Sequence, residues 1–171
     1  LMNDIILLKQ GEVVLKGLNK RFFEQKLLTC VKKKLKPIGA FRVYCLQSTV
    51  YVEPEDEGAD MDAAFAALSR VFGVIALTRA AACEKNEDAI AALARTYLAD
   101  ALSRAASFKV ETRRSDKSFH MTSIQLSQYV GGVLADAYPN CRPRMHDPEL
   151  TVHLEVRDYA AYVHAAPLPG A

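Results

Sequence analysis

Two short segments that alternate apolar and more polar residues constrain the fold of the first half of the chain more than any other feature. They are FRVYCLQ (residues 41–47) and TVYVEP (49–54). Because successive side chains of a strand point to opposite faces, each segment is expected to bury one face of an antiparallel sheet. Before them, one set of residues lies at helical spacing and predicts a helix that packs on that sheet: Phe23, Leu27, Cys30, Val31 and Leu35.

The elements around these strands complete an ordered unit. A buried strand is predicted at residues 2–10 and a second helix at residues 62–73, which gives strand, helix, strand, strand, helix and then a closing strand. This is the order of a ferredoxin-like sandwich. With 171 residues the chain is long enough for two small domains, and the first is expected to span residues 1–73.

A second domain is expected over residues 74–165, which makes the whole chain α+β. Its strands are predicted at residues 74–83, 108–113, 149–158 and 160–165. The last two are expected to form a hairpin that turns at residues 157–159. Asn86 is expected to cap one helix, which continues through Ala101.

The last predicted helix contains two glycines. Thr122 and Gln125 have the spacing of a capping box at its start. Its buried face is predicted to contain Leu126, Val130, Val133, Leu134 and Ala137. Gly131 and Gly132 each cost roughly 1 kcal/mol in a helix relative to alanine, so another backbone of the core is expected to pack closely against them.

The composition is that of a folded protein: 50% of the residues are hydrophobic and 25% are charged, with a formal net charge of +2. No segment has the roughly 18–20 apolar residues of a membrane span, and no signal-peptide pattern opens the chain, so a cytoplasmic location without a membrane partner is expected. The four cysteines form no CxxC pair and are predicted to be buried reduced thiols: Cys30, Cys45, Cys83 and Cys141.

Catalytic motifs are missing from the sequence. It contains no GxGxxG after a strand, no GxxxxGK[ST], no HExxH and no SGGxDS loop of the kind that binds pyrophosphate in adenylating enzymes. The four histidines lack metal-ligand spacing, and the carboxylate-rich segment EPEDEGADMD (53–62) is expected to be a solvated loop. We therefore predict no catalytic residue, no metal and no cofactor in this chain, which is not expected to be an enzyme by itself.

A basic segment, FKVETRRSDKSFHMTS, connects a predicted strand to the last helix. Arg113, Arg114 and Lys117 crowd where free backbone N–H groups and the positive end of a helix dipole meet, which favours phosphate binding. Arg142 and Arg144, in a loop ahead of another strand, could extend this patch. On spacing alone, ordinary solvated charges explain the segment equally well. As exposed charges, Arg113 and Arg114 are expected to contribute little to stability.

A second group of polar and basic residues surrounds the start of the first predicted helix. Asn19 is expected to cap that helix. Lys16, Lys20 and Arg21 lie at the same end, where cations oppose the helix dipole, and this indicates an anionic partner. The run KKKLK (32–36) lies at the opposite end, where lysines complement the dipole and structure alone explains them.

Four segments resemble parts of a known family, in the same order along the chain. QGEVVLKGLNKRFFEQKL is similar to the N-terminal signature of the bacterial tRNA 4-thiouridine synthetases, also called thiamine-biosynthesis sulfurtransferases. FKVETRRSDKSFHMTSIQLSQYVGGVL resembles the core of a THUMP domain, and DPELTVHLEVRDYAAYVH resembles its last hairpin. APLPGA (166–171) resembles the linker to an ATP pyrophosphatase domain, which implies that this chain is the N-terminal half of a longer enzyme.

The resemblance implies a role in tRNA modification. In this family a ferredoxin-like domain followed by a THUMP domain grips the acceptor stem and 3′ CCA end of tRNA. A further domain, expected to be missing here together with its ATP loop and catalytic cysteine, uses ATP and Mg to adenylate uridine 8. A cysteine desulfurase donates the sulfur, and the family is typically dimeric. With two arginines added from their charge and loop position, the RNA-binding candidates are Lys16, Asn19, Lys20, Arg21, Lys109, Arg113, Arg114, Lys117, Ser118, His120, Arg142 and Arg144.

Alternative interpretations remain open. The THUMP domain could belong to an RNA methyltransferase or a pseudouridine synthase, although the LKGLN segment argues against this. A ferredoxin-like fold could also form a small-molecule regulatory domain. Phe119 and Tyr129 could stack on RNA bases, but core packing is favoured for both.

Overall fold

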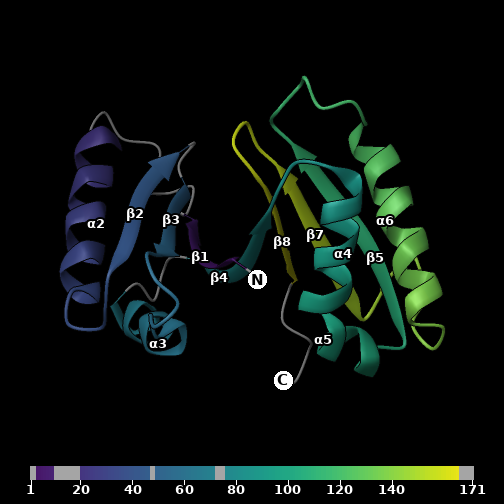
Figure 1. Cartoon of the computed structure of the whole chain (residues 1–171), viewed down its shortest axis with the longest axis horizontal. Coiled ribbons are helices and arrows are strands. Elements are labelled where there is room, and N and C mark those ends of the chain that lie inside the picture. The colour runs from purple at the N-terminus through teal and green to yellow at the C-terminus, as the bar shows by residue number, and fades with distance from the viewer. Residues whose placement is uncertain (1–2, 10–19, 47–48, 72–75, 166–171) are drawn as a thin grey trace. The chain divides into compact units, whose positions relative to one another are not determined.

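The computed structural model of the chain describes residues 3–9, 20–46, 49–71 and 76–165 (Figure 1). The chain divides into two compact units, with Asp4–Arg79 in the N-terminal unit and the C-terminal unit beginning at Ala80. The domain boundary predicted between residues 73 and 74 falls outside the described residues.

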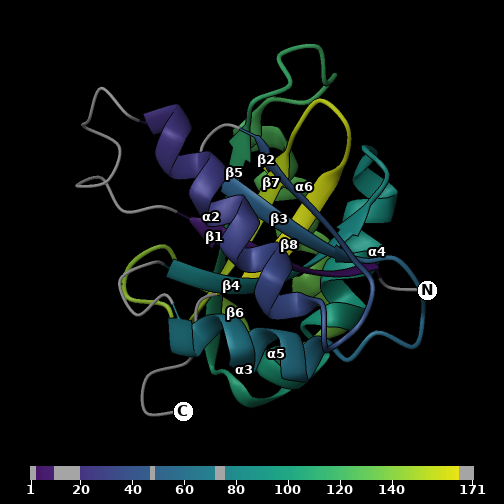
Figure 2. The same cartoon turned by 90° about the vertical axis from the view of Figure 1, so that its left-hand side faces the viewer.

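The N-terminal unit has the predicted element order. Its elements are β1 (Asn3–Lys9), α2 (Lys20–Leu35), β2 (Phe41–Leu46), β3 (Thr49–Pro54), α3 (Met61–Val71) and the first half of β4 (Ala76–Cys83). The strands lie in the order β2-β3-β1-β4, and β3 pairs antiparallel with both β2 and β1. Figure 2 shows α2 in front of these strands and α3 below them. The prediction of a ferredoxin-like sandwich is confirmed.

The core of this unit lies between its two helices and its sheet. Cys30, predicted on the buried face of α2, is only half-buried, and the side chain of Phe23 lies outside what the structure describes. Leu27, Val31 and Leu35 are buried, as their spacing predicted. They share one hydrophobic cluster with Leu68 of α3 and with residues of β1, β2 and β3. The start of α3 is capped by Asp60, whose side chain accepts from the Ala63 N–H at 2.9 Å. The predicted cap of α2 at Asn19 lies outside the described residues.

The C-terminal unit is a second α/β layer structure. Its further elements are α4 (Glu87–Tyr97), α5 (Ala99–Arg104), β5 (Ser107–Arg114), α6 (Ser123–Ala137), β6 (Arg142–Pro143), β7 (Leu150–Val156) and β8 (Ala161–Ala165). The strand order is β4-β8-β7-β5-β6, with β5 parallel to both β7 and β6. The predicted hairpin of β7 and β8 is confirmed, and the Arg157 N–H donates to the Ala160 carbonyl across its turn at 3.0 Å.

One face of this second sheet is apolar and packs on helices. Phe108 of β5 and Leu154 of β7 are buried in one cluster with Leu126 and Val130 of α6. The capping box at Thr122 and the cap at Asn86 both form as predicted. The prediction that Ala137 is buried is wrong, because this last residue of α6 is exposed.

The helix predicted to run from Asn86 through Ala101 is two helices. α4 ends at Tyr97 and α5 begins at Ala99. Just before the break, the Thr96 hydroxyl donates to the Leu93 carbonyl at 3.3 Å and to the carbonyl one residue earlier at 3.1 Å. Such bonds compete with the helical backbone ladder and bend helices.

The two glycines of α6 do not face a close backbone, so that prediction is wrong. A Cβ added at Gly131 would lie 3.8 Å from the Val110 side chain, which is ordinary contact. A Cβ at Gly132 would meet no described atom within 4 Å.

All four cysteines are free thiols, but the prediction that they are buried holds for Cys141 alone. The other three are half-buried. Burial raises the pKa of the Cys83 thiol to about 11, so this thiol is protonated at neutral pH.

Candidate nucleic-acid interface

The adjacent arginines at the end of β5 point to opposite faces of the sheet, because side chains alternate along a strand. Arg114 is half-buried, and its Nη1 donates to the Phe119 carbonyl at 3.1 Å and to the Met121 carbonyl at 3.2 Å. Arg113 is exposed and forms no ion pair or hydrogen bond with another described residue. The expectation that both arginines are exposed charges is therefore wrong for Arg114, which holds the loop that follows the strand.

The buried carboxylate of Asp116 anchors the same loop. Lys85 donates to Asp116 Oδ2 at 2.7 Å and to the Asp158 carbonyl at 2.6 Å. The other carboxylate oxygen accepts from the backbone N–H and the hydroxyl of Ser118, at 3.0 Å and 2.5 Å. Asp116 thus ties the loop to the residues after β4 and to the turn between β7 and β8. It also occupies the hydroxyl of Ser118, one of the candidate RNA ligands.

Replacing Asp116 with asparagine is expected to make stability less sensitive to acid. The hydrogen bond from Lys85, followed by those from Ser118, lowers the pKa of this carboxyl from 3.8 to about 2. Because the folded-state pKa is depressed, the stabilisation is fully present above pH 3.8 and is lost as the pH falls toward 2. The thermal midpoints of wild type and Asp116→Asn should therefore converge between these pH values, and a constant difference would contradict the assignment.

The aromatic residues near the loop behave differently from one another. Phe119 is 8% exposed and packs in the core, as predicted. Tyr129 is 39% exposed, so the prediction of core packing is wrong for it. Its hydroxyl donates to Asp88, which raises the pKa of the Tyr129 phenol. The exposure of Tyr129 depends on the angle at which α6 packs on its sheet. The spacing of residues along the sequence does not determine that angle.

His120 has a partner that the sequence did not reveal. Its Nε2 lies in hydrogen-bond contact with the Glu87 carboxylate at the start of α4. This hydrogen bond from His120 lowers the pKa of Glu87. The imidazole remains 60% exposed, so it is available at the surface beside the loop.

Arg113, Lys117 and His120 form what we term the loop cluster, because each is exposed near the junction of β5 and α6. Lys117 makes no ion pair or hydrogen bond with any other residue that the structure describes. Lys109 lies on the same face of β5 as Arg113, but it pairs with Glu111 at 2.7 Å. That hydrogen bond lowers the pKa of Glu111 and offsets the charge of Lys109.

Arg142 and Arg144 do not extend the loop cluster, so that part of the prediction is wrong. Arg142 belongs to the short strand β6, which pairs with Ser107 and Phe108 at the start of β5. The cluster lies at the other end of β5, about 20 Å away at the usual rise of a strand. Figure 1 shows the loop before α6 and the loop after it at opposite ends of the strand. Both arginines are exposed.

The candidates of the N-terminal unit are described in part. Lys16 and Asn19 lie outside the described residues. Lys20 is the first residue of α2, and Arg21 after it is exposed. The described first turn of α2 carries no acidic residue that would complement the helix dipole.

Within the described parts of the chain, no group of three or more His, Cys, Asp or Glu residues is arranged to hold a metal ion. The described helices include none with the length and apolar character needed to cross a bilayer.

The chain has curated relatives in bacteria. The probable tRNA sulfurtransferase of Acetivibrio thermocellus is 31% identical over 166 residues, which cover 96% of this chain and 42% of that protein. The probable tRNA sulfurtransferase of Staphylococcus saprophyticus is 33% identical over 167 residues, which cover 98% of this chain and 40% of that protein. The chain therefore spans about two fifths of the length of these relatives.

Solved structures share the fold. A 4-thiouridine synthetase in complex with RNA and ATP gives a TM-score of 0.78 at 15% identity, over 97% of this chain and 42% of that chain. PH1313 from Pyrococcus horikoshii gives 0.78 at 21% identity, over 96% of this chain and 54% of that chain.

Two domain families match the sequence directly. Residues 5–78 match the ThiI ferredoxin-like domain, and residues 84–165 match the THUMP domain. The chain therefore consists largely of two domains in succession, a ThiI ferredoxin-like domain followed by a THUMP domain.

Proposed function

We propose that this chain is the tRNA-binding portion of a tRNA uracil 4-sulfurtransferase. It grips the acceptor arm and 3′ CCA end so that uridine 8 is presented to a separate adenylating and thiolating domain. The observation that carries the proposal is an exposed pair of cations within a THUMP domain: Arg113 at the end of β5 and Lys117 on the loop that follows. Arg114 and Asp116 hold this loop in place. The names of the curated relatives support the same function.

The geometry of the loop suits a phosphate backbone. Guanidinium and ammonium groups bind phosphate oxygens strongly, and such contacts fix the position of a nucleic acid without reading its sequence. Because the loop is anchored by hydrogen bonds from Arg114 and to Asp116, little conformational entropy is lost on binding. Preorganisation of this kind raises affinity without further contacts.

The remaining candidate RNA-binding residues fall into two groups, according to whether they already bond to another residue of the chain. Lys20, Arg21, Arg142 and Arg144 are proposed as further phosphate contacts, together with Lys16 and Asn19. Lys109, Ser118 and His120 already bond to Glu111, Asp116 and Glu87 respectively. Each of these three must exchange that partner, or share it, to bind RNA.

The whole protein needs components that this chain is not proposed to supply. ATP and Mg act in a separate catalytic domain, and a cysteine desulfurase supplies the sulfur. A homodimer would let one subunit present tRNA to the other. We therefore assign binding, and no chemical step, to the present chain.

An electrophoretic shift with tRNA tests the proposal. The chain should shift intact tRNA at low salt and bind less tightly to tRNA that lacks its 3′ CCA. With about five of the seven proposed cations on phosphates at once, a plot of log affinity against log salt concentration should have a slope near −4. No shift at low salt, or equal affinity for both tRNAs, would refute the function.

A further inference from the structure

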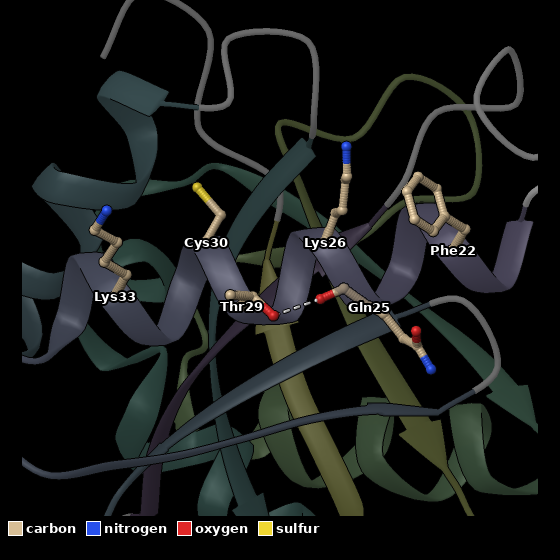
Figure 3. Close-up of a pocket in the computed structure, with 6 residues that line it drawn as sticks. All are labelled: Phe22, Gln25, Lys26, Thr29, Cys30 and Lys33. Carbon is tan, nitrogen blue, oxygen red and sulfur yellow. Dashed lines mark hydrogen bonds between the residues drawn. The ribbon is translucent and has the colours of Figure 1, made fainter.

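α2 presents a second basic surface on its side facing away from the core. Six of its residues line an open hollow of about 550 Å³ (Figure 3), and we term them the α2 stripe: Phe22, Gln25, Lys26, Thr29, Cys30 and Lys33. Each of these residues has another member of the group three or four positions away, so all six lie on one side of the helix. The buried residues Leu27, Val31 and Leu35 occupy the opposite side.

α2 is far more positively charged than the chain as a whole. The helix contains six Lys or Arg and one Glu, whereas the chain has a net charge of +2. Complementing the dipole explains Lys33, which lies in the last turn, but that effect fades within one turn and does not reach Lys26. Neither Lys26 nor Lys33 forms an ion pair with another residue in the described part of the chain. The charge of Lys26 therefore has neither a carboxylate partner there nor the helix dipole to compensate it.

The other side chains of the stripe hold the lysines in a polar setting with one aromatic ring. Phe22 is 58% exposed, and the Lys26 ammonium lies 4.7 Å from the centroid of its ring. This cation–π contact orients the ammonium outward along the helix. The Thr29 hydroxyl donates to the backbone carbonyl of Gln25 at 2.9 Å.

We propose that the α2 stripe contacts the sugar–phosphate backbone of the RNA that this chain binds. This inference rests on the proposed function and adds a surface that runs along α2 from its first turn to its last. Lys26 and Lys33 are about 10 Å apart along the helix axis, so each can meet a separate phosphate. A basic groove with an exposed aromatic ring is the composition of surfaces that follow a nucleic-acid strand.

An acidic protein surface is the competing occupant, and the stripe fits it less well. Protein interfaces have an apolar centre from which lysine is depleted. Here lysines occupy the middle and the end of the stripe, and Phe22 is its one large apolar side chain. RNA is therefore the occupant that the composition favours.

The test compares two double variants of the full chain. Lys26→Gln with Lys33→Gln removes two charges from the stripe. Lys32→Gln with Lys34→Gln removes the same charge from the same helix, at positions about 100° to either side of Lys33. tRNA affinity is measured for each by fluorescence anisotropy over a range of salt concentrations. The thermal midpoint of each variant checks that it is folded.

The stripe variant should give a log–log salt slope less steep than wild type by about 1.5, because two phosphate contacts are lost. The control variant should keep the wild-type slope. An unchanged slope in the stripe variant, or equal flattening in the control, would overturn the inference. So would a stripe variant that binds tRNA normally but has lost affinity for polyglutamate, since the surface would then serve an acidic protein.

The outcome also separates this inference from the function on which it rests. If the wild type fails to bind tRNA, the proposed function is wrong. If the wild type binds and Arg113→Ala weakens binding while the stripe variant does not, the function stands and the α2 stripe alone is refuted.

Discussion

Replacing Glu155 with alanine is expected to destabilise the C-terminal unit by about 3–5 kcal/mol, the usual cost of breaking a buried ion pair by removing one partner. The Glu155 side chain is 5% exposed and accepts from Arg157 Nη2 at 2.7 Å and from His164 Nε2 at 2.8 Å. Arg157 and His164 are themselves 13% and 9% exposed, so solvent screens these pairs little. Without the carboxylate, the Arg157 guanidinium loses this ion pair in a site that is largely shielded from solvent.

Urea unfolding and hydrogen exchange of amides in β7 and β8 measure this loss, because both strands belong to the unit that is affected. Glu57→Ala is the matched control, since this carboxylate is exposed in the turn before α3 and its removal should change stability by less than about 0.5 kcal/mol. If Glu155→Ala cost no more than the control, the cluster of Glu155, Arg157 and His164 would not stabilise the fold.

Hydrophobic periodicity predicted the order of the elements because it is a local property of the chain. The antiparallel pairing of β2 with β3 and the hairpin of β7 with β8 both join segments that are close in sequence, and both are confirmed. The parallel pairing of β5 with β7 joins segments that are separated by α6. Local alternation does not indicate such a partner, and the short strand β6 had no periodic signal at all.

The candidate site was predicted as a set of residue types, whereas its geometry depends on contacts between distant segments. Lys85 and Asp116 are 31 positions apart, and His120 and Glu87 are 33 positions apart. Charge counting along the sequence gives no indication of which cation meets which carboxylate. Lys117 and His120 were therefore equivalent candidates in the sequence. Of these two, only His120 has a carboxylate partner among the described residues.

One signal in the sequence could have separated the two arginines. Phe108 and Val110 are the apolar residues of β5, and Arg114 has the same parity along the strand, so it must lie on the helix-covered face. Arg113 has the parity of Lys109 and Glu111 and must lie on the other face. Counting charges alone assigns Arg113 and Arg114 to one basic patch. Because side chains alternate along a strand, Arg114 instead holds the loop and Arg113 is exposed.

Replacing Arg114 with alanine should therefore lower the unfolding free energy by about 2 kcal/mol, and replacing Arg113 should change it by less than about 0.5 kcal/mol. Arg114 donates two charge-assisted hydrogen bonds to the carbonyls of Phe119 and Met121, which are otherwise left without this donor in a half-buried loop. Arg113 forms no such bond with a described residue. Thermal unfolding of the two single variants measures the difference.

tRNA binding should reverse the importance of the two residues. Arg113→Ala removes one phosphate contact and should flatten the log–log salt slope by about 0.8 in a chain that is as stable as wild type. Arg114→Lys serves as the control for charge at the second position, because a single ammonium keeps the charge but cannot reproduce the planar geometry of a guanidinium. This variant should lose stability while keeping the salt slope. An Arg113→Ala variant that unfolds, or one that binds tRNA as the wild type does, would show that strand parity does not separate anchoring from binding in this loop.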